Sequence, residues 1–202
     1  MIQTKKLFTF GKLNMSEVME PLLTSSLRNR TKSVHGKLDE HLMGMGLFSD
    51  KEKYKIFLTL QYYIHRDADH LYSNSNLSAI IPNLHLRNRF VKVKEDMQDL
   101  GVTIPSPIQP PVITNTSSAI GSLYVVEGSK LGAKYLLHHV GMIGLSDEYG
   151  ARHLGADSEG RGTSWRSFQS AIDSAKIDIP VAVKAAEQTF ERVFSHLQNI
   201  TG

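Results

Sequence analysis

The 202-residue sequence contains no cysteine. Disulfides, thiolate metal sites, iron–sulfur clusters and a cysteine nucleophile are therefore excluded for this chain. No apolar run approaches the roughly 18 residues that a membrane-spanning helix needs. The first residues, MIQTKKLFTFGKLN, also lack the apolar stretch and cleavage site of a secretory signal. These absences predict a cytoplasmic protein that does not enter a membrane.

A strong charge of either sign is missing as well. The 23 Lys and Arg residues nearly balance the 20 Asp and Glu residues, which leaves a net charge of +3. Nucleic-acid-binding domains concentrate basic residues more heavily, so no nucleic-acid partner is expected. One local basic cluster consists of His85, Arg87, Arg89, Lys92 and Lys94. We interpret this cluster as a solvated helix face, with a docking patch for an acidic partner as the alternative.

Alternation of apolar and polar residues, the pattern of a half-buried strand, is also absent. Apolar residues instead recur at steps of three and four, for example from Leu23 to Leu42 and from Val183 to Leu197. The hydrophobic fraction of 41% is that of an ordinary globular chain. The predicted fold is all-α, a bundle of about seven to nine helices in a single domain over residues 1–202. Residues 1–14 are expected to form a loose lead-in.

Prolines, glycines and capping residues set the expected helix boundaries. The first long helix is predicted from residue 17 or 21 to Met43, and the second from the Ser49-Asp50 cap to about Leu71. Pro82 is expected to open a helix that ends before Gly101. Asn115 or Thr116, Ser164 and Pro180 are expected to begin the last three helices.

The segment from Gly121 to His139 holds the most unusual pattern. In a helix, Gly121, Val125, Gly128 and Gly132 lie on one stripe. Each glycine costs about 1 kcal/mol relative to alanine within a helix, so three on one face need a physical reason. Bare backbone permits close approach, either of another helix or of a planar ligand. This segment alone leaves both interpretations open.

His35 has a carboxylate one helical turn away. Asp39, at position i+4, can accept a hydrogen bond from one ring nitrogen and leave the other free as a metal ligand. The alternative is a half-buried histidine whose hydrogen bonding is satisfied by Asp39.

A second group of polar residues closes the next helix. His65, Asp67, Asp69 and His70 contain one Asp-x-x-His and no Glu-x-x-His, so a di-iron site is not expected. We interpret this group as a polar helix end.

Two of these segments resemble one known family. The run Thr31-Lys32-Ser33-Val34-His35, followed by Asp39, resembles the proximal helix of heme oxygenases, in which TK-x-VH supplies the histidine that ligates heme iron. The run YVVEGSKLGA from Tyr124 resembles the distal helix of the same family. Its GS-x-LG pattern is similar to the bacterial branch, which includes enzymes that supply biliverdin to bacterial phytochromes. The segment GRGTSWRSF, which contains Arg166, is also similar to that branch.

The resemblance implies roles for individual residues. His35 would be the axial ligand of the heme iron, with Asp39 as the partner of its second nitrogen. Gly128 and Gly132 would let the distal helix approach the opposite heme face.

Arg28, Arg166 and Tyr124 would lie near the heme propionates, which cationic side chains suit well. Ser129 stands where the animal enzymes carry an aspartate. Its hydroxyl can donate or accept a hydrogen bond but carries no charge, so the resemblance alone does not give the proton route.

The resemblance further implies an enzyme that cleaves heme with O2 to biliverdin, CO and ferrous iron, with heme as both substrate and cofactor. Electrons would come from a separate reductase, ferredoxin or flavodoxin, because the chain has no nucleotide-binding fingerprint. The alternative is a heme-binding protein of the same fold that stores or transfers heme without turnover. A thiaminase-type relative is disfavoured, because such relatives depend on a cysteine.

Overall fold

The computed structural model describes residues 22–202. The expected lead-in, residues 1–14, and the alternative starts of the first helix at residues 17 and 21 lie outside the described part. The described part consists of α helices and short 3-10 helices without a named strand, which confirms the all-α prediction. The elements are α1 (Leu23–Gly44), α2 (Lys51–Ala68), η1 (Asp69–Ser73), α3 (Ser75–Ser78), η2 (Leu84–Arg87), α4 (Phe90–Asp99), α5 (Thr116–Gly141), η3 (Arg152–Leu154), α6 (Arg161–Asp173) and α7 (Ile179–Thr201).

Side-chain caps fix the start of three long helices. Asp50 accepts a hydrogen bond from the Lys53 amide at the start of α2, and Asn115 accepts one from Ser118 at the start of α5. Asp178 caps α7, with Pro180 in its first turn. Each cap satisfies a backbone N–H that the helix itself leaves free.

Two predicted helix starts are wrong. The helix expected from Pro82 begins only at Phe90, because Asn83 adopts a left-handed conformation (φ 54°) and a turn of 3-10 helix follows. Its predicted end is confirmed at Gly101, where φ is +62°. The helix expected from Ser164 begins at Arg161 instead, after Gly160.

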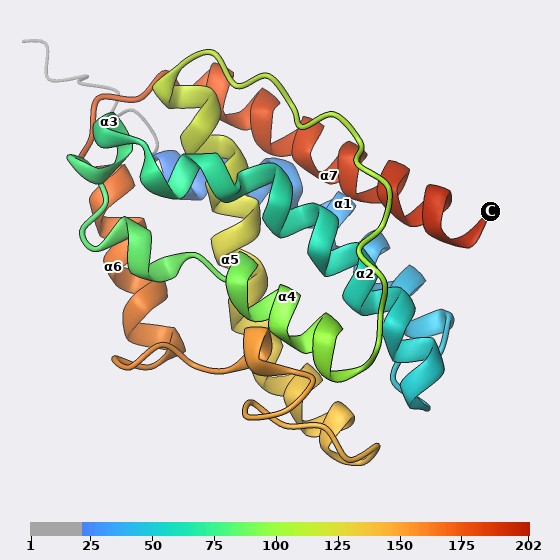
Figure 1. Cartoon of the computed structure of the whole chain (residues 1–202). Helices are drawn as coiled ribbons and strands as arrows, with labels where there is room; N and C mark the ends of the chain where they lie inside the picture. Colours follow the sequence, from blue (N-terminus) through green and yellow to red (C-terminus); the bar gives the residue numbers. More distant parts are fainter. Residues whose placement is uncertain (1–21) are drawn as a thin grey trace, which may run out of the picture.

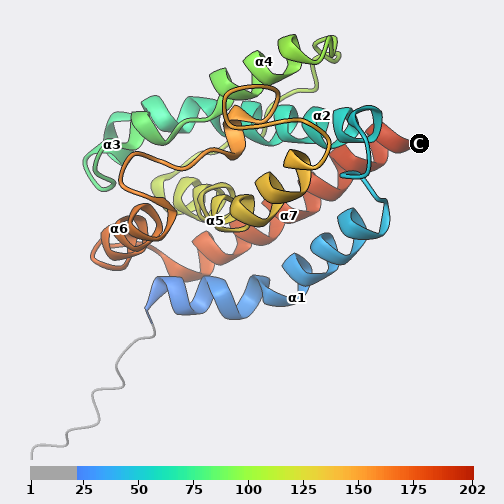
Figure 2. The same ribbon diagram turned by 90° about the horizontal axis from the view of Figure 1, so that it is seen from below.

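The long helices form layers, with α7 near the centre. Figure 2 shows α1 on one side, α5 and α7 in the middle, and α2 and α4 on the other side. Both α1 and α5 pack mainly on α7 and have little contact with each other. The main core lies between these layers and includes Leu27, Leu71, Ile120 and Phe168. No helix in residues 22–202 is both long enough and apolar enough to cross a membrane.

The crossing of α5 and α7 depends on the first glycine of the stripe. A Cβ at Gly121 would overlap the carbonyl oxygen of Ala182 and lie 2.8 Å from its carbonyl carbon. The helix-crossing interpretation is therefore confirmed at Gly121. At Gly128 a Cβ would touch the Trp165 ring at 3.5 Å, whereas at Gly132 it would meet nothing within 4 Å. The stripe thus contacts another helix at Gly121 and faces open space at Gly132.

Gly121→Ala is expected to lower the free energy of unfolding by about 1–3 kcal/mol, because the new methyl group forces α5 away from the α7 backbone. Gly132→Ala is the matched control on the same stripe. It should raise the free energy of unfolding by about 0.5–1 kcal/mol, since alanine favours the helix and meets no neighbour. Urea denaturation of both variants measures the difference. Equal effects would contradict the assignment of the crossing to Gly121.

Candidate functional site

The imidazole of His35 projects from α1 with one nitrogen engaged. Its Nδ1 lies 3.0 Å from Oδ2 of Asp39, and 54% of the side chain is exposed. The Phe190 ring of α7 meets the imidazole edge-on, with ring centroids 5.9 Å apart. The predicted contact between His35 and Asp39 is thus present. Because Nδ1 faces the carboxylate, Nε2 is the nitrogen that remains for a ligand.

The second half of α5 presents a strip around Gly128 and Gly132, two positions without a side chain. Gly132 faces open space, and Leu131 and Tyr135 next to it are exposed apolar residues. Ser129 donates its hydroxyl to the carbonyl of Val126 at 2.8 Å. Its oxygen can still accept a hydrogen bond from water or from a ligand. This strip could therefore take the flat, apolar face of a ligand.

Cationic side chains lie on α1 and α6. Arg28 is exposed and makes no ion pair with a described residue, and exposed Arg166 donates to the Thr163 hydroxyl at 3.3 Å. Burial raises the pKa of Tyr124, and the nearby positive charge of Arg28 acts in the opposite direction. Arg28 and Tyr124, from α1 and α5, therefore lie close enough to interact.

Two hydrogen bonds between Thr24 and Asp173 fix α1 relative to α6. The backbone N–H and the hydroxyl of Thr24 both donate to the Asp173 carboxylate, at 2.9 and 2.6 Å. This contact holds the helix of His35 and the helix of Arg166 in a fixed relation. His35 and Arg166, both predicted to bind the ligand, are therefore held at fixed positions relative to each other.

A buried ionic cluster, which the sequence did not predict, lies on another face of α5. Glu127 is 3% exposed and accepts hydrogen bonds from the Tyr72 hydroxyl at 2.7 Å, Lys130 at 2.6 Å and Arg87 at 3.2 Å. Arg87 also donates to the hydroxyl of Ser164 at 2.9 Å. Burial and Glu127 raise the pKa of Tyr72, so its phenol stays protonated as a donor. The cluster ties α5 to η1, η2 and α6.

The interpretation of the basic cluster as a solvated face is wrong for two of its members. Arg87 and Arg89 are only 5% and 3% exposed, and they pair with Glu127 and Asp157 inside the protein. A local signal existed, because Glu127 is the only acidic residue in the 26 residues of α5 and implied a buried basic partner. The distant partners themselves could not be read from the sequence.

The polar end of α2 is also more buried than expected. His65 is 3% exposed, and burial lowers its pKa well below the usual value, so its ring is neutral at pH 7. Asp67 is buried as well, among Arg66, Arg192 and His196. Within residues 22–202 no three His, Asp or Glu side chains are grouped so as to hold a metal ion.

Comparisons with known proteins identify the class to which this arrangement belongs. The structure matches the NO- and CO-bound heme oxygenase of Neisseria meningitidis with a TM-score of 0.84 and 31% identity, over 89% of this chain and 92% of that one. It matches heme oxygenase-1 of the cyanobacterium Synechocystis, solved with heme, with a TM-score of 0.68 at 16% identity, again over 89% and 92% of the two chains. The fold is therefore that of the heme oxygenases.

The sequence leads to the same family. The heme oxygenase family model matches residues 22–199. Heme oxygenase PigA of Pseudomonas aeruginosa is 31% identical over 176 residues, which are 85% of this chain and 89% of that protein. The chain belongs to the heme oxygenase family.

Glu127→Ala is expected to destabilise the fold by about 3–5 kcal/mol, because it leaves the buried cations of Arg87 and Lys130 without their carboxylate. Glu187→Ala is the control. It removes a carboxylate whose pair with Arg30 is exposed, so its effect should stay within about 1 kcal/mol. Thermal and urea unfolding measure both. A cost for Glu127→Ala no larger than the control's would contradict the role of the cluster.

Proposed function

We propose that this chain cleaves heme with O2 to biliverdin, CO and ferrous iron, and that His35 is the iron ligand. The observation that carries the assignment of the ligand is the geometry of His35 itself. Its Nδ1 faces Asp39, its ring is held by Phe190, and more than half of its side chain is exposed. Membership of the heme oxygenase family and its heme oxygenase relatives support the reaction.

The donor set fits heme. A neutral imidazole is a common axial ligand of heme iron, and a carboxylate on its second nitrogen raises its basicity. Gly132 offers bare backbone to a flat ring, and the exposed Arg28 and Arg166 suit the two charged propionates. Heme, when bound, supplies both the iron that activates O2 and the ring that is cut.

The residues of this chain would bind the heme, orient it and order the water beside it. His35 would hold the ring from the α1 side, and Gly132 would offer bare backbone rather than a side chain to the opposite face. Ser129 places a hydroxyl oxygen beside this strip, where it can order a water but cannot itself hold a charge. We assign the delivery of protons to ordered water for this reason.

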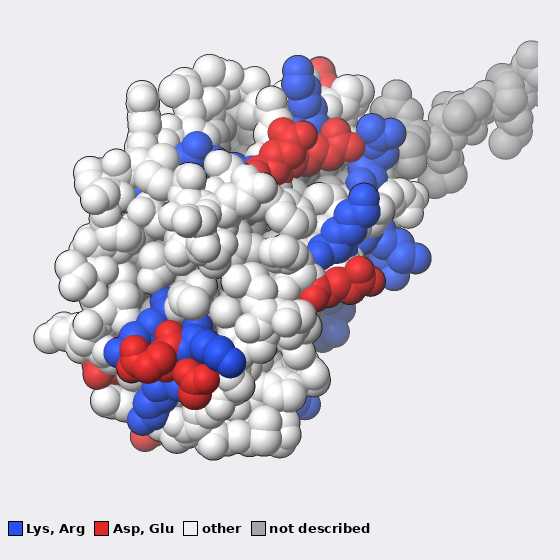
Figure 3. Space-filling view, turned by 90° about the vertical axis from the view of Figure 1, so that its right-hand side faces the viewer, with Lys and Arg blue, Asp and Glu red and all other residues white. Residues whose placement is uncertain are grey.

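Electrons are proposed to come from a separate reductase, ferredoxin or flavodoxin, since the sequence has no nucleotide-binding fingerprint. The face drawn in Figure 3 mixes Lys and Arg with Asp and Glu and leaves broad uncharged areas. We place the protein in the cytoplasm as a single domain; the cysteine-free composition supports the compartment.

The reaction is tested with purified protein, hemin and a reductant in air. We expect the Soret band to decline as a biliverdin absorption grows, and chromatography of the product identifies the bilin. A stable oxygenated heme complex without bilin would favour the alternative, a heme carrier of the same fold.

His35→Ala is expected to abolish turnover and to remove the imidazole-ligated spectrum of the ferric complex. His41→Ala is the matched control, because His41 is also exposed on α1. Absorption and resonance Raman spectra of the hemin-loaded variants measure the ligand directly. An unchanged spectrum in His35→Ala would place the ligand at another histidine.

Gly132→Leu is expected to weaken hemin binding at least tenfold, about 1.4 kcal/mol, by filling the space over the strip. The protein itself should stay folded, because a Cβ at Gly132 meets no neighbour. Gly141→Leu on the same helix is the control, since it also meets nothing within 4 Å. Hemin titration compares them. Equal hemin affinities for the unsubstituted protein, Gly132→Leu and Gly141→Leu would mean that the strip does not contact heme.

A further inference from the structure

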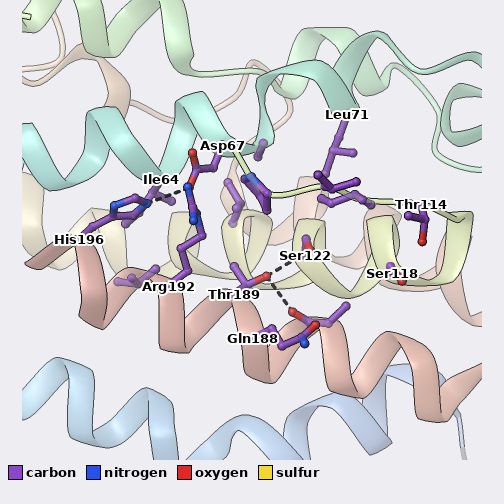
Figure 4. Close-up of a pocket in the computed structure, with 17 residues that line it drawn as sticks. Ile64, Asp67, Leu71, Thr114, Ser118, Ser122, Gln188, Thr189, Arg192 and His196 are labelled. Atoms are coloured by element: carbon purple, nitrogen blue, oxygen red, sulfur yellow. Dashed lines mark hydrogen bonds and ion pairs between the residues drawn. The ribbon is translucent and has the colours of Figure 1, made fainter. Parts of the chain in front are cut away.

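A cavity of about 230 Å³ lies between α2, α5 and α7, under the segment 111–114 (Figure 4). On α5 it is lined by Ser118, Ser122 and Val126, at steps of four residues. This stripe is rotated by about 100° around the helix axis from the stripe of Gly121, Gly128 and Gly132. Neither His35 nor Gly132 lines the cavity, so it is separate from the site proposed for heme.

One end of the cavity is ionic. Oδ2 of Asp67 accepts hydrogen bonds from Arg192 Nε and, at 2.8 Å, from His196 Nε2, and Oδ1 accepts one from Arg66 at 2.6 Å. Figure 4 shows Arg192 and His196 side by side, both directed at Asp67. Burial alone would raise the pKa of Asp67, but the bonds from His196, Arg192 and Arg66 lower it to about 2. One ionised carboxylate thus faces two guanidinium groups, which leaves an excess of one positive charge.

One polar atom at this end lacks a partner. Nδ1 of His196, whose residue is 2% exposed and lines the cavity, has no hydrogen-bond partner in residues 22–202. Buried polar groups are normally hydrogen-bonded, so such orphans indicate a missing ligand or water. Because Nε2–H of His196 donates to Asp67, Nδ1 of the neutral ring is an acceptor that a water or a hydroxyl can satisfy, whereas a ligand carboxylate would pair with the guanidinium of Arg192, which also lines the cavity.

The rest of the wall is apolar or hydroxylated. Ile64, Leu71 and Val193 contribute hydrocarbon, while Ser122 and Thr189 already bond to each other at 3.1 Å. The cover is the irregular segment that follows α4. It is anchored by hydrogen bonds to its backbone carbonyls, from Arg192 to Gln109 at 2.5 Å and from the Tyr63 hydroxyl to Ser106 at 3.0 Å. The same arginine therefore faces the cavity and fastens its cover.

We propose that this cavity binds a small monocarboxylate with an apolar body. The carboxylate would lie at the guanidinium of Arg192, and the hydrocarbon along Ile64, Leu71 and Val126. An apolar cavity of about 150 Å³ is large enough for benzene, so the larger volume here suits an acid of about six to eight carbons. This binding is independent of heme cleavage and goes beyond it.

Isothermal titration with octanoate and with 1-octanol tests the charge requirement, since both have the same chain length. The protein is first loaded with hemin and checked by its Soret band, so that the heme site is not available to the probe. We expect octanoate to bind at one site and 1-octanol to bind at least tenfold more weakly. Amide chemical shifts, measured on the loaded protein, should change in 111–118 and 189–196. The proposal would be overturned if neither probe bound, if both bound equally, or if the shifts were confined to α1. A cavity that holds only water predicts no binding of either probe.

Arg192→Gln is expected to weaken octanoate binding at least tenfold and to leave 1-octanol unchanged. Lys184→Gln is the matched control, because it removes one positive charge from an exposed position of α7 outside the cavity. Ser118→Leu serves as a second variant that fills the opposite end and keeps the ionic group intact. It should weaken both probes. Octanoate affinity unchanged in Arg192→Gln and Ser118→Leu would refute the site.

Discussion

The contact of α5 with α7 at Gly121 is the constraint on which the arrangement of the site depends. Only a residue without a side chain lets the α5 backbone lie against the carbonyl group of Ala182. The same α7, which can be followed from its label in Figure 1, carries Phe190, which packs against His35, and Glu187, which pairs with Arg30 of α1. Because α1 and α5 have little contact with each other, α7 alone sets much of their relation. A shift at the crossing would move the glycine strip relative to the imidazole.

Away from that crossing, the position of α5 is secured by charge. Glu127 adjoins Gly128 in sequence, yet it points into a cluster with Tyr72, Arg87 and Lys130. Buried ions are costly unless they are paired and hydrogen-bonded, and Glu127 here accepts hydrogen bonds from Tyr72 at 2.7 Å, Lys130 at 2.6 Å and Arg87 at 3.2 Å. The helix is therefore held by close contact with the α7 backbone at one end and by a buried ionic cluster further along. This leaves the strip at Gly132 without a structural task of its own.

The features that the sequence predicted correctly are those that local geometry determines. The contact of His35 with Asp39 follows from i, i+4 spacing, and the cap at Asn115 follows from one side chain and one turn. The burial of Arg87 could not be predicted from local geometry, because its partners Glu127 and Ser164 are 40 and 77 residues away. Ser164 is not a cap because the helix already begins at Arg161, and its hydroxyl accepts a hydrogen bond from Arg87. The cavity beside Arg192 could not be predicted either, because it joins residues from α2, α5, α7 and the segment between α4 and α5.

The distribution of charge around α5 bears on how the proposed reaction is controlled. Carboxylate and ammonium groups lie on the buried side at Glu127 and Lys130, and Arg28 is near Tyr124. The strip itself offers backbone, apolar carbon and the hydroxyl of Ser129, whose proton is donated to its own helix, with the exposed phenol of Tyr135 at its edge. Gly128, Ser129 and Gly132 supply no charged acid that could transfer a proton directly to a bound molecule. We propose that proton transfer there passes through water, held in the space that the absent side chain of Gly132 leaves open.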